Sequence, residues 1–297
     1  MSSRFGFIAV IGPPNAGKST LANALIGQKV SIVTHKAQTT RARLRGVVIK
    51  DDAQIVLVDT PGVFAGQKKM DKAMVDEAWA GADDADAIAL VLDASRPLPK
   101  ETELVLAGLE NRSKPVILVL NKVDAVRHEK LLELTESLNN QFNFYETFMV
   151  SALKEDGLDM LLDRLASLVP EGVWHYPEDM AADVPSLLLA AEITREKLFL
   201  RMHQELPYAL TVETEKWTRQ KNGSVKIEQV IYVRRDTQKA IILGKGGRSI
   251  KEIGALARQE MEEIFGHRVH LFLFVKVREN WIDDPERIRM MGINASS

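Results

Sequence analysis

The sequence predicts an α/β domain with a mostly parallel six-stranded sheet, followed by a smaller α+β domain. In the first half of the chain, short runs of Val, Ile and Leu alternate with stretches of helical period. This alternation is typical of parallel strands whose two faces are both covered by helices. In the second half, a long helical stretch precedes two strands, a short helix, a glycine-rich loop, a helix and a last strand. The expected division is 1–172 for the first domain, 173–185 for a linker rich in proline and acidic residues, 186–278 for the second domain, and 279–297 for a tail without clear period.

The individual elements follow from these patterns in order. Six apolar runs predict strands at 5–11, 43–49, 53–59, 87–93, 115–121 and 145–151. Amphipathic stretches between them predict helices at 18–27, 71–82, 101–110, 129–140 and 157–168. In the second domain we expect a helix over 186–205, strands over 208–218 and 224–235, a helix over 250–264 and a strand over 268–278.

Composition and charge exclude several classes of protein. The chain has no cysteine, which excludes disulfide frameworks and thiolate metal sites. Its longest apolar runs, "AIALVL" and "HLFLFV", are far shorter than the about 20 residues that cross a bilayer. Residues 1–184 carry 20 Lys and Arg against 26 Asp and Glu, whereas residues 185–297 carry 19 against 15. The excess of basic residues in the second half indicates either binding of a polyanion or a chance difference in charge between solvated surfaces.

A phosphate-binding loop lies between the first strand and the first helix. The stretch "GPPNAGKST" matches the pattern G-x-x-x-x-G-K-[ST] in the context that this pattern requires. Small residues let backbone N–H groups face the phosphates, and the helix N-terminus adds partial positive charge. Lys18 can reach the β- and γ-phosphates, and the Ser19 hydroxyl can bind Mg²⁺. The expected nucleotide contacts in this loop are Gly12, Asn15, Ala16, Gly17, Lys18, Ser19 and Thr20.

Three companion motifs follow later strands and predict that the nucleotide is GTP. In "VDTPG", Asp59 can bind Mg²⁺ through water and Gly62 can offer its N–H to a γ-phosphate. In "NKVD", the Asp124 carboxylate can accept both N1–H and N2–H of guanine, which adenine cannot supply. "SAL" can supply a backbone N–H to the guanine O6. The further expected contacts are Thr60, Pro61, Val63, Asn121, Lys122, Ser151, Ala152 and Leu153.

With these motifs the first domain resembles GTPases of the translation-factor-related class. Their switch I threonine corresponds to "AQTTR", with Thr40 the first choice for the Mg²⁺ ligand and Thr39 the alternative.

Val63 stands where Ras-like enzymes have the glutamine that orients water, so we expect slow hydrolysis, no faster than about 10⁻⁴ to 10⁻³ per second. Relatives with "PNxGKS" hold a potassium ion with the loop asparagine. Asn15 has that position, and either binds K⁺ to stimulate hydrolysis or only braces the loop. The catalytic residues implied are Lys18, Asn15, Thr40 and Gly62.

The stretch "LGKGGRS" is a second glycine-rich loop with a different role. It joins two helical segments and is flanked by basic residues, so its backbone can press against phosphates. A G-x-x-G turn of this kind clamps about four nucleotides of single-stranded nucleic acid. The alternative is an ordinary glycine turn. With its surrounding elements, the second domain resembles a KH module that has an extra helix in front, and the expected RNA-binding residues are Gly244, Lys245, Gly246, Gly247, Arg248 and Lys251.

A GTPase domain joined to a KH module with "GKGG" resembles the Era-type GTPases over nearly the whole chain. The resemblance implies a monomeric cytoplasmic protein that binds GTP, GDP and Mg²⁺ and acts on the 3′ end of 16S rRNA in 30S subunit assembly. It also implies peripheral association with the inner face of the membrane, without a transmembrane segment. Two alternatives remain at this stage. One is an RNA-binding protein whose GTP site is structural; the other is a GTPase subunit of an RNA-modifying enzyme, for which no second catalytic motif is present.

Overall fold

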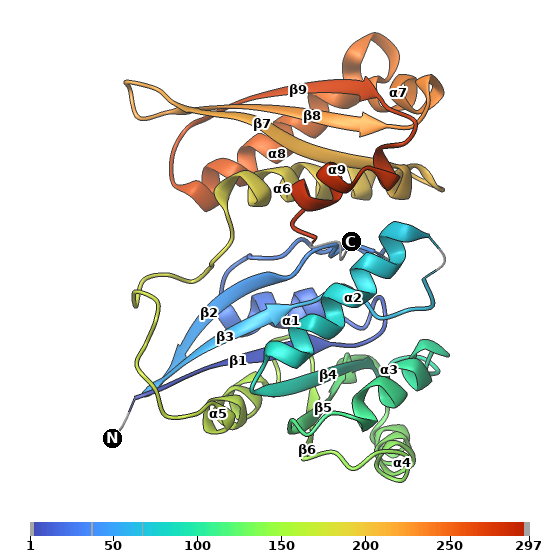
Figure 1. The fold of residues 1–297 in the computed structure, drawn as a ribbon, viewed down its shortest axis with the longest axis vertical. Helices are drawn as coiled ribbons and strands as arrows, with labels where there is room; N and C mark the ends of the chain where they lie inside the picture. Colours follow the sequence, from blue (N-terminus) through green and yellow to red (C-terminus); the bar gives the residue numbers. More distant parts are fainter. Residues whose placement is uncertain (1–2, 37, 67, 294–297) are drawn as a thin grey trace. The chain divides into compact units, whose positions relative to one another are not determined.

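The computed structural model describes residues 3–36, 38–66 and 68–293. The chain forms two compact units, which are treated separately below (Figure 1). The first comprises Met1–Ser31 and Thr40–Asp183, and the second comprises Ile32–Thr39 and Val184–Ser297. Ala37 of the "AQTTR" motif and residues 294–297 of the expected tail lie outside the described residues.

The first unit contains the expected six-stranded sheet, in the order β2-β3-β1-β4-β5-β6. Strand β2 is antiparallel to β3 and all other neighbours are parallel, which confirms the predicted fold class. Because the parallel strands run in the same direction, their carboxyl ends lie at one edge of the sheet. The strands are β1 (Arg4–Ile11), β2 (Leu44–Lys50), β3 (Ala53–Asp59), β4 (Ala87–Asp93), β5 (Val116–Asn121) and β6 (Glu146–Val150).

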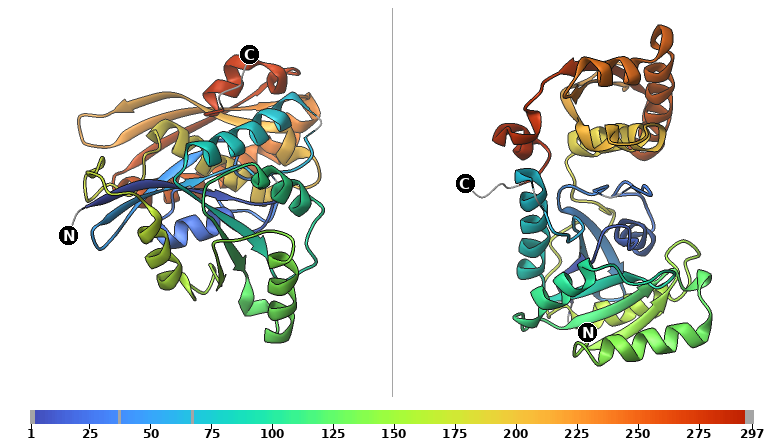
Figure 2. Two further views of the ribbon diagram at one scale, coloured as in Figure 1. Left: turned by 60° about the horizontal axis from the view of Figure 1, so that its bottom comes forward. Right: turned by 90° about the vertical axis from the view of Figure 1, so that its right-hand side faces the viewer.

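Helices cover both faces of this sheet, as the continuous apolar strands require. One face packs against α1 (Lys18–Ile26) and α5 (Leu158–Leu168), and the other packs against α2 (Lys69–Asp84), α3 (Glu101–Glu110) and α4 (His128–Asn139). Figure 2 shows the two helical layers with the sheet between them. Each strand of the sheet is thereby held from both sides, which fixes the loops that leave its carboxyl ends.

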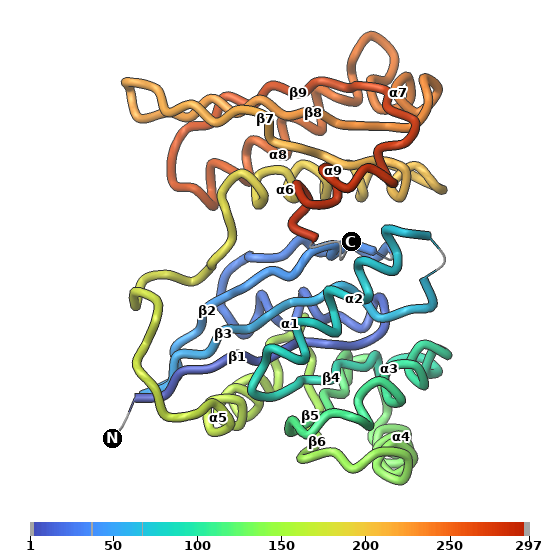
Figure 3. The backbone as a smooth tube through the Cα atoms, viewed as in Figure 1, coloured from blue at the N-terminus to red at the C-terminus, as the bar shows by residue number. Residues whose placement is uncertain are grey.

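The second unit is a three-stranded sheet with helices on one face. Strand β7 (Leu210–Arg219) is antiparallel to β8 (Val225–Val233), and β8 is parallel to β9 (Val269–Val277). Helices α6 (Ser186–Arg201) and α8 (Arg248–Phe265) pack against the apolar face of the sheet. Figure 3 traces the chain from α7 (Asp236–Leu243) through the one-turn η3 (Lys245–Gly247) into α8. This order of elements confirms the predicted KH-type arrangement.

The helix expected over 186–205 is shorter than the spacing of its apolar residues suggested. It ends at Arg201, because Met202 has an extended backbone. The chain then forms η2 (Leu206–Ala209), a 3₁₀ helix that contains Pro207. Proline removes a backbone donor and cannot continue an α-helix. The side chains of Met202 and Leu206 are nevertheless buried in the same core as α6, which explains why the apolar spacing continued past the helix end.

The segment after Glu279 has no clear period, yet the structure gives it two short elements. These are η4 (Trp281–Asp283) and α9 (Pro285–Met290). Trp281 is fully buried and donates its indole N–H to the Ala209 carbonyl at 3.3 Å. Arg287 pairs with both carboxylate oxygens of Glu213 at 2.7 Å. These partners are far away in sequence, so local periodicity could not indicate them. In the described part of the chain, no helix has the length and apolar character needed to cross a membrane.

Candidate functional site

The loop between β1 and α1 has a backbone that only glycine allows at two positions. Gly17 has a φ of +95°, and a Cβ there would lie 2.3 Å from the Asn121 side-chain nitrogen. Gly12 has a φ of +153°, and its Cβ would lie 2.2 Å from the Val91 carbonyl oxygen. Both distances are too short for real atoms. The two glycines therefore let the loop fold tightly over the sheet edge, with the N-terminus of α1 at its end, where anions bind.

Lys18 is a buried cation that lies inside this loop. Its ammonium group donates to the carbonyls of Gly12 and Pro13, both at 3.1 Å. Burial lowers the pKa of Lys18 to about 8, although the nearby Asp59 carboxylate raises it. A buried ammonium group bonded to two loop carbonyls is well placed to bind a phosphate.

Three oxygen-bearing side chains from different segments meet beside Lys18. The Ser19 hydroxyl donates to Asp59 Oδ2 at 2.7 Å and lies 2.8 Å from the Thr40 hydroxyl. Thr40 also donates to Asp59 Oδ2 at 3.3 Å. The Asp59 side chain is buried, and burial raises its pKa. Its second oxygen, Oδ1, is buried without a hydrogen-bond partner. Hydroxyl and carboxylate oxygens are the ligands that Mg²⁺ prefers, and the unpartnered carboxylate oxygen can accept a hydrogen bond from a water bound to the ion.

Thr39 faces different partners from Thr40. Its hydroxyl lies 2.6 Å from the Thr34 hydroxyl and donates to the Lys36 carbonyl at 2.7 Å. The two threonines of "AQTTR" therefore separate: Thr40 lies with Ser19 and Asp59, and Thr39 closes a turn within its own segment. This geometry favours Thr40 as the ligand.

The segment after Asp59 crosses close to the phosphate-binding loop. A Cβ on Gly62 would lie 3.0 Å from Pro14, so the two segments touch. The backbone N–H of Val63 donates to the Gly12 carbonyl at 3.1 Å. The Val63 side chain is buried in the core beside α2 and α3. Because this side chain points into the core and is apolar, it cannot orient an attacking water.

The motifs expected to bind the base are joined by hydrogen bonds between their side chains and loops. Asn121 donates to the Ala16 carbonyl at 3.0 Å and accepts from the Ala152 N–H at 3.1 Å. It thereby joins the phosphate-binding loop to the loop after β6. The Asp124 carboxylate accepts from the Ser151 hydroxyl at 2.6 Å through Oδ1. This bond joins the loop after β5 to the loop after β6.

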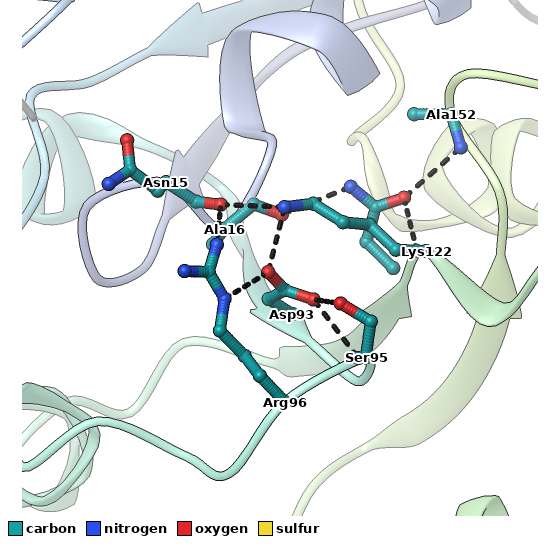
Figure 4. A network of polar contacts seen from close by, with 8 residues as sticks. Asn15, Ala16, Asp93, Ser95, Arg96, Lys122 and Ala152 are labelled. Carbon is teal, nitrogen blue, oxygen red and sulfur yellow. Dashed lines mark hydrogen bonds and ion pairs between the residues drawn. The ribbon is translucent and has the colours of Figure 1, made fainter. Parts of the chain in front are cut away.

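A charged network that the sequence motifs did not indicate surrounds Lys122 (Figure 4). The Lys122 ammonium group donates to Asp93 at 2.7 Å and to the Asn15 carbonyl at 3.0 Å. Arg96 donates to the same carboxylate at 2.6 Å, and Ser95 also bonds to it. Burial raises the pKa of Asp93, but these hydrogen bonds outweigh burial and hold it at about 2. In the sequence, only the position of Asp93 at the end of a predicted strand could have indicated this network. In the structure, Asp93 ends β4 directly beside Asn121 of β5.

The remaining predicted contacts differ in exposure. Asn15 has a φ of +63°, and Figure 4 shows its exposed side chain turned away from the Lys122 network. The Thr60 hydroxyl is buried and donates to the Val10 carbonyl at 2.8 Å, which fixes β3 against β1. Pro61 lies between Thr60 and Gly62, and Thr20 is partly buried in α1. Leu153 is 77% exposed at the rim.

The second glycine-rich loop lies in the second unit and is open to solvent. Gly244, Gly246 and Gly247 have φ values of +69°, +63° and +73°. A Cβ on either of the last two would meet no atom within 4 Å, so the backbone is accessible from outside. The flanking basic side chains Lys245, Arg248 and Lys251 are all exposed. The structure therefore presents an accessible glycine backbone at the N-terminus of α8, surrounded by cations.

Apolar residues beside this loop divide between surface and core. Ile241 is 58% exposed, and Leu256 on α8 is 43% exposed. Ile242 and Ile253 are fully buried, and Ile250 packs partly against the same core. Of the four isoleucines near the loop, the two fully buried ones serve packing, and the exposed one can contact a base.

Comparison with known proteins gives the same two parts. A family model described as a 50S ribosome-binding GTPase matches residues 7–122, and a KH domain model matches residues 205–282. GTPase Era of Sinorhizobium medicae is 59% identical over 292 residues, which are 98% of this chain and 94% of the relative. GTPase Era of Agrobacterium fabrum is 57% identical over 293 residues, which are 99% and 92% of the two chains.

Solved structures agree over the same length. The crystal structure of Era in complex with MgGDPNP and nucleotides 1506–1542 of 16S ribosomal RNA has a TM-score of 0.93 at 38% identity. It covers 98% of this chain and 99% of that chain. A variant of Aquifex aeolicus Era bound to GDP and AlF₄⁻ has the same TM-score, identity and coverage. The chain therefore belongs to the Era family of GTPases, in which a GTPase domain precedes a KH domain.

Proposed function

We propose that this GTPase is a nucleotide-dependent switch that binds the 3′ end of 16S rRNA and assists assembly of the 30S subunit. One observation carries the proposal: the chain combines an Mg²⁺-type cluster that includes Thr40 with an exposed glycine clamp in a basic setting. The Era structure that resembles this chain was solved with MgGDPNP and nucleotides 1506–1542 of 16S rRNA, which supports both halves of the proposal. We also propose a monomer in the cytoplasm that associates peripherally with the inner face of the membrane.

In this proposal, each buried side chain of the nucleotide site has a role. Lys18 binds the β- and γ-phosphates, and its charge offsets theirs. Ser19 and Thr40 would supply hydroxyl ligands to Mg²⁺, and Asp59 Oδ1, which is buried without a hydrogen-bond partner, would accept from a water on the ion. When bound, Mg²⁺ neutralises charge that develops on the transferred phosphoryl group. Gly62 donates its N–H to the γ-phosphate, so loss of that phosphate releases both Gly62 and Thr40.

Base selection comes from the motifs that Asn121 joins. Asp124 accepts the two guanine N–H groups, and its bond to Ser151 keeps the carboxylate oriented. The loop after β6 supplies a backbone N–H to the guanine O6, and the Ala152 N–H in this loop is bonded to Asn121. Lys122 packs its stem along the base while its ammonium group stays bonded to Asp93. GTP is therefore preferred over ATP.

The second unit binds single-stranded RNA at its glycine loop. The backbone of Gly244–Gly247 presses against the sugar–phosphate chain, and Lys245, Arg248 and Lys251 neutralise phosphates. Ile241 offers an apolar surface to a base. RNA affinity should depend on the bound nucleotide, and linkage makes the effect reciprocal for binding.

The RNA test compares two nucleotide states. We expect RNA ending in the 3′ tail of 16S rRNA to bind more tightly to the protein loaded with a GTP analogue than to the GDP form, at fixed salt. Gly246→Asp should lower RNA affinity at least tenfold, because it places a negative charge against phosphates. Fluorescence anisotropy with labelled RNA measures both effects.

Gly246→Asn is the matched control, because asparagine has the same shape, no charge, and tolerates positive φ. It should lose much less affinity than Gly246→Asp. Equal RNA binding in both nucleotide states would favour the alternative in which the GTP site is structural. Absence of RNA binding in both states would contradict the clamp.

Asn15 gives a separate prediction about the reaction rate. Val63 cannot orient water, so unassisted hydrolysis should be slow, and a K⁺ ion held by the Asn15 side chain would add positive charge beside the phosphates. We expect hydrolysis by the wild type to be faster in K⁺ than in Na⁺. Asn15→Gly should remove the difference, since glycine keeps the positive φ without the amide. Equal hydrolysis rates of the wild type in K⁺ and Na⁺ would contradict the proposed role of Asn15.

The buried ammonium group of Lys18 predicts that nucleotide binding takes up protons. Its pKa is about 8 without nucleotide, and neighbouring phosphates raise it. Binding of GDP should therefore take up about half a proton at pH 8 and much less at pH 7, and affinity should fall as pH rises above 8. Calorimetry in buffers with different ionisation enthalpies measures this uptake. Lys18→Met should abolish it, and identical uptake at both pH values would refute the assignment.

A further inference from the structure

The sheet of the second unit carries two exposed aromatic side chains on the face that its helices do not cover. Along β9, Leu271, Leu273 and Val275 pack into the core with α6 and α8. Because side chains alternate along a strand, Phe272 and Phe274 lie on the opposite, outer face. They are 46% and 50% exposed. Neighbouring apolar side chains on one open face mark an interaction site, whereas single ones do not.

The C-terminal segment of the chain covers another part of this outer face. Arg287 of α9 lies over the Tyr232 ring of β8 at 3.9 Å and donates to Glu213 of β7 at 2.7 Å. Tyr232 is consequently buried. Phe272 and Phe274 are on the neighbouring strand β9 and keep their exposure beside the covered part. The C-terminal segment therefore leaves the aromatic part of the face accessible.

Basic residues surround the two rings. The β7–β8 hairpin and β9, taken as residues 214–230 and 268–277, contain six Lys and Arg against two Glu. The two glutamates, Glu215 and Glu228, each pair with a lysine of the same region. The remaining excess of positive charge attracts a polyanion. The six basic residues are Lys216, Arg219, Lys221, Lys226, Arg268 and Lys276.

A cation lies directly beside one of the rings. The Lys226 ammonium group is 5.1 Å from the centre of the Phe272 ring. His270 lies opposite Lys226 in the strand pairing and next to Phe272 on the outer face. Aromatic rings flanked by cations bind single-stranded nucleic acid, because bases stack on the rings and the cations meet the phosphates. Phe272 and Phe274 are two positions apart, about 7 Å along the strand, so each ring can hold its own base.

One RNA strand can reach both the glycine clamp and these rings. Helix α8 begins at Arg248, directly after the clamp, and a Cβ on Gly254 of this helix would lie 3.4 Å from the Leu273 side chain. Six residues of helix span about 9 Å. Leu273 lies between Phe272 and Phe274, and β9 is at the edge of the sheet order β7-β8-β9. A strand that leaves the clamp therefore has a short path around this edge to the outer face.

We propose that Phe272 and Phe274 form a second RNA subsite, the sheet platform, on which two bases of a single strand stack outside the clamp. Lys226 and the basic residues around it neutralise the phosphates of these nucleotides. The inference rests on the proposed binding of RNA by this unit, and it extends the contact beyond the roughly four nucleotides that a G-x-x-G clamp holds. Since every base has an aromatic face, the sheet platform adds affinity with little sequence preference.

The test compares two single strands from the 3′ tail of 16S rRNA, of about six and about twelve nucleotides, at fixed salt. In the double variant Phe272→Leu, Phe274→Leu, affinity for the longer strand should fall at least about fivefold, because leucine keeps the apolar surface and removes the stacking ring. Affinity for the shorter strand should equal that of the wild type, which also shows that the unit is folded. Fluorescence anisotropy measures both affinities.

The conservative variant is Phe272→Tyr, Phe274→Tyr, which keeps both rings. Its affinity for the longer strand should stay within about twofold of the wild type, since tyrosine also stacks on bases. Leu200→Ala is the control for loss of an exposed apolar side chain, because Leu200 on α6 is 49% exposed. It should bind both strands like the wild type. Equal affinity of the leucine and tyrosine variants for the longer strand would contradict stacking.

Two further results would overturn the proposal. An equal loss of affinity for both strands in the leucine variant would place the defect in the clamp or the fold. Unchanged affinity for the longer strand would exclude the sheet platform, and if the same variant bound 30S particles less tightly, the face would belong to a ribosomal protein instead. Absence of RNA binding by the wild type would contradict the proposed function itself, whereas wild-type binding that the leucine variant retains contradicts the sheet platform alone.

Discussion

The buried carboxylate of Asp59 is the point on which the nucleotide site depends. It ends β3, directly beside Val10 of β1, and receives hydrogen bonds from Ser19 and Thr40. Three segments that are far apart in sequence therefore meet on one oxygen, while the other oxygen has no partner. A buried carboxylate with an unsatisfied oxygen is costly unless a cation completes the site. The same group thus holds three segments together and presents a buried acceptor of the kind that Mg²⁺ and its bound water favour.

Amide and ion-pair contacts link the loops after β4, β5 and β6 to the loop after β1. Asn121 connects the loop after β5 to Ala16, and Lys122 connects it to Asn15. Asp93 neutralises Lys122 from the neighbouring strand β4. Because these bonds cross between the loops, the loops after β5 and β6 and the loop after β1 support one another. Such shared support is how a site built from loops stays preorganised.

The sequence predicted the parts of this site that lie in motifs at strand ends, because a parallel sheet brings such ends together. It also predicted a glycine turn between two helical segments, because glycine readily adopts the positive φ that such a turn requires. It did not reveal Asp93 and Arg96, which follow an ordinary strand and gain their role from Lys122. Nor could it show that Trp281 is buried. Those depend on tertiary contacts between distant segments, which leave no local pattern.

The most direct test of the central claim is a structure of the protein with Mg²⁺ and a non-hydrolysable GTP analogue. The account predicts that the hydroxyl oxygens of Thr40 and Ser19 bind the ion at about 2.1 Å, with Asp59 reaching it through water. The Thr39 hydroxyl should keep its contact with Thr34. A structure in which Thr39 replaces Thr40 on the ion, or in which neither threonine approaches it, would contradict the account.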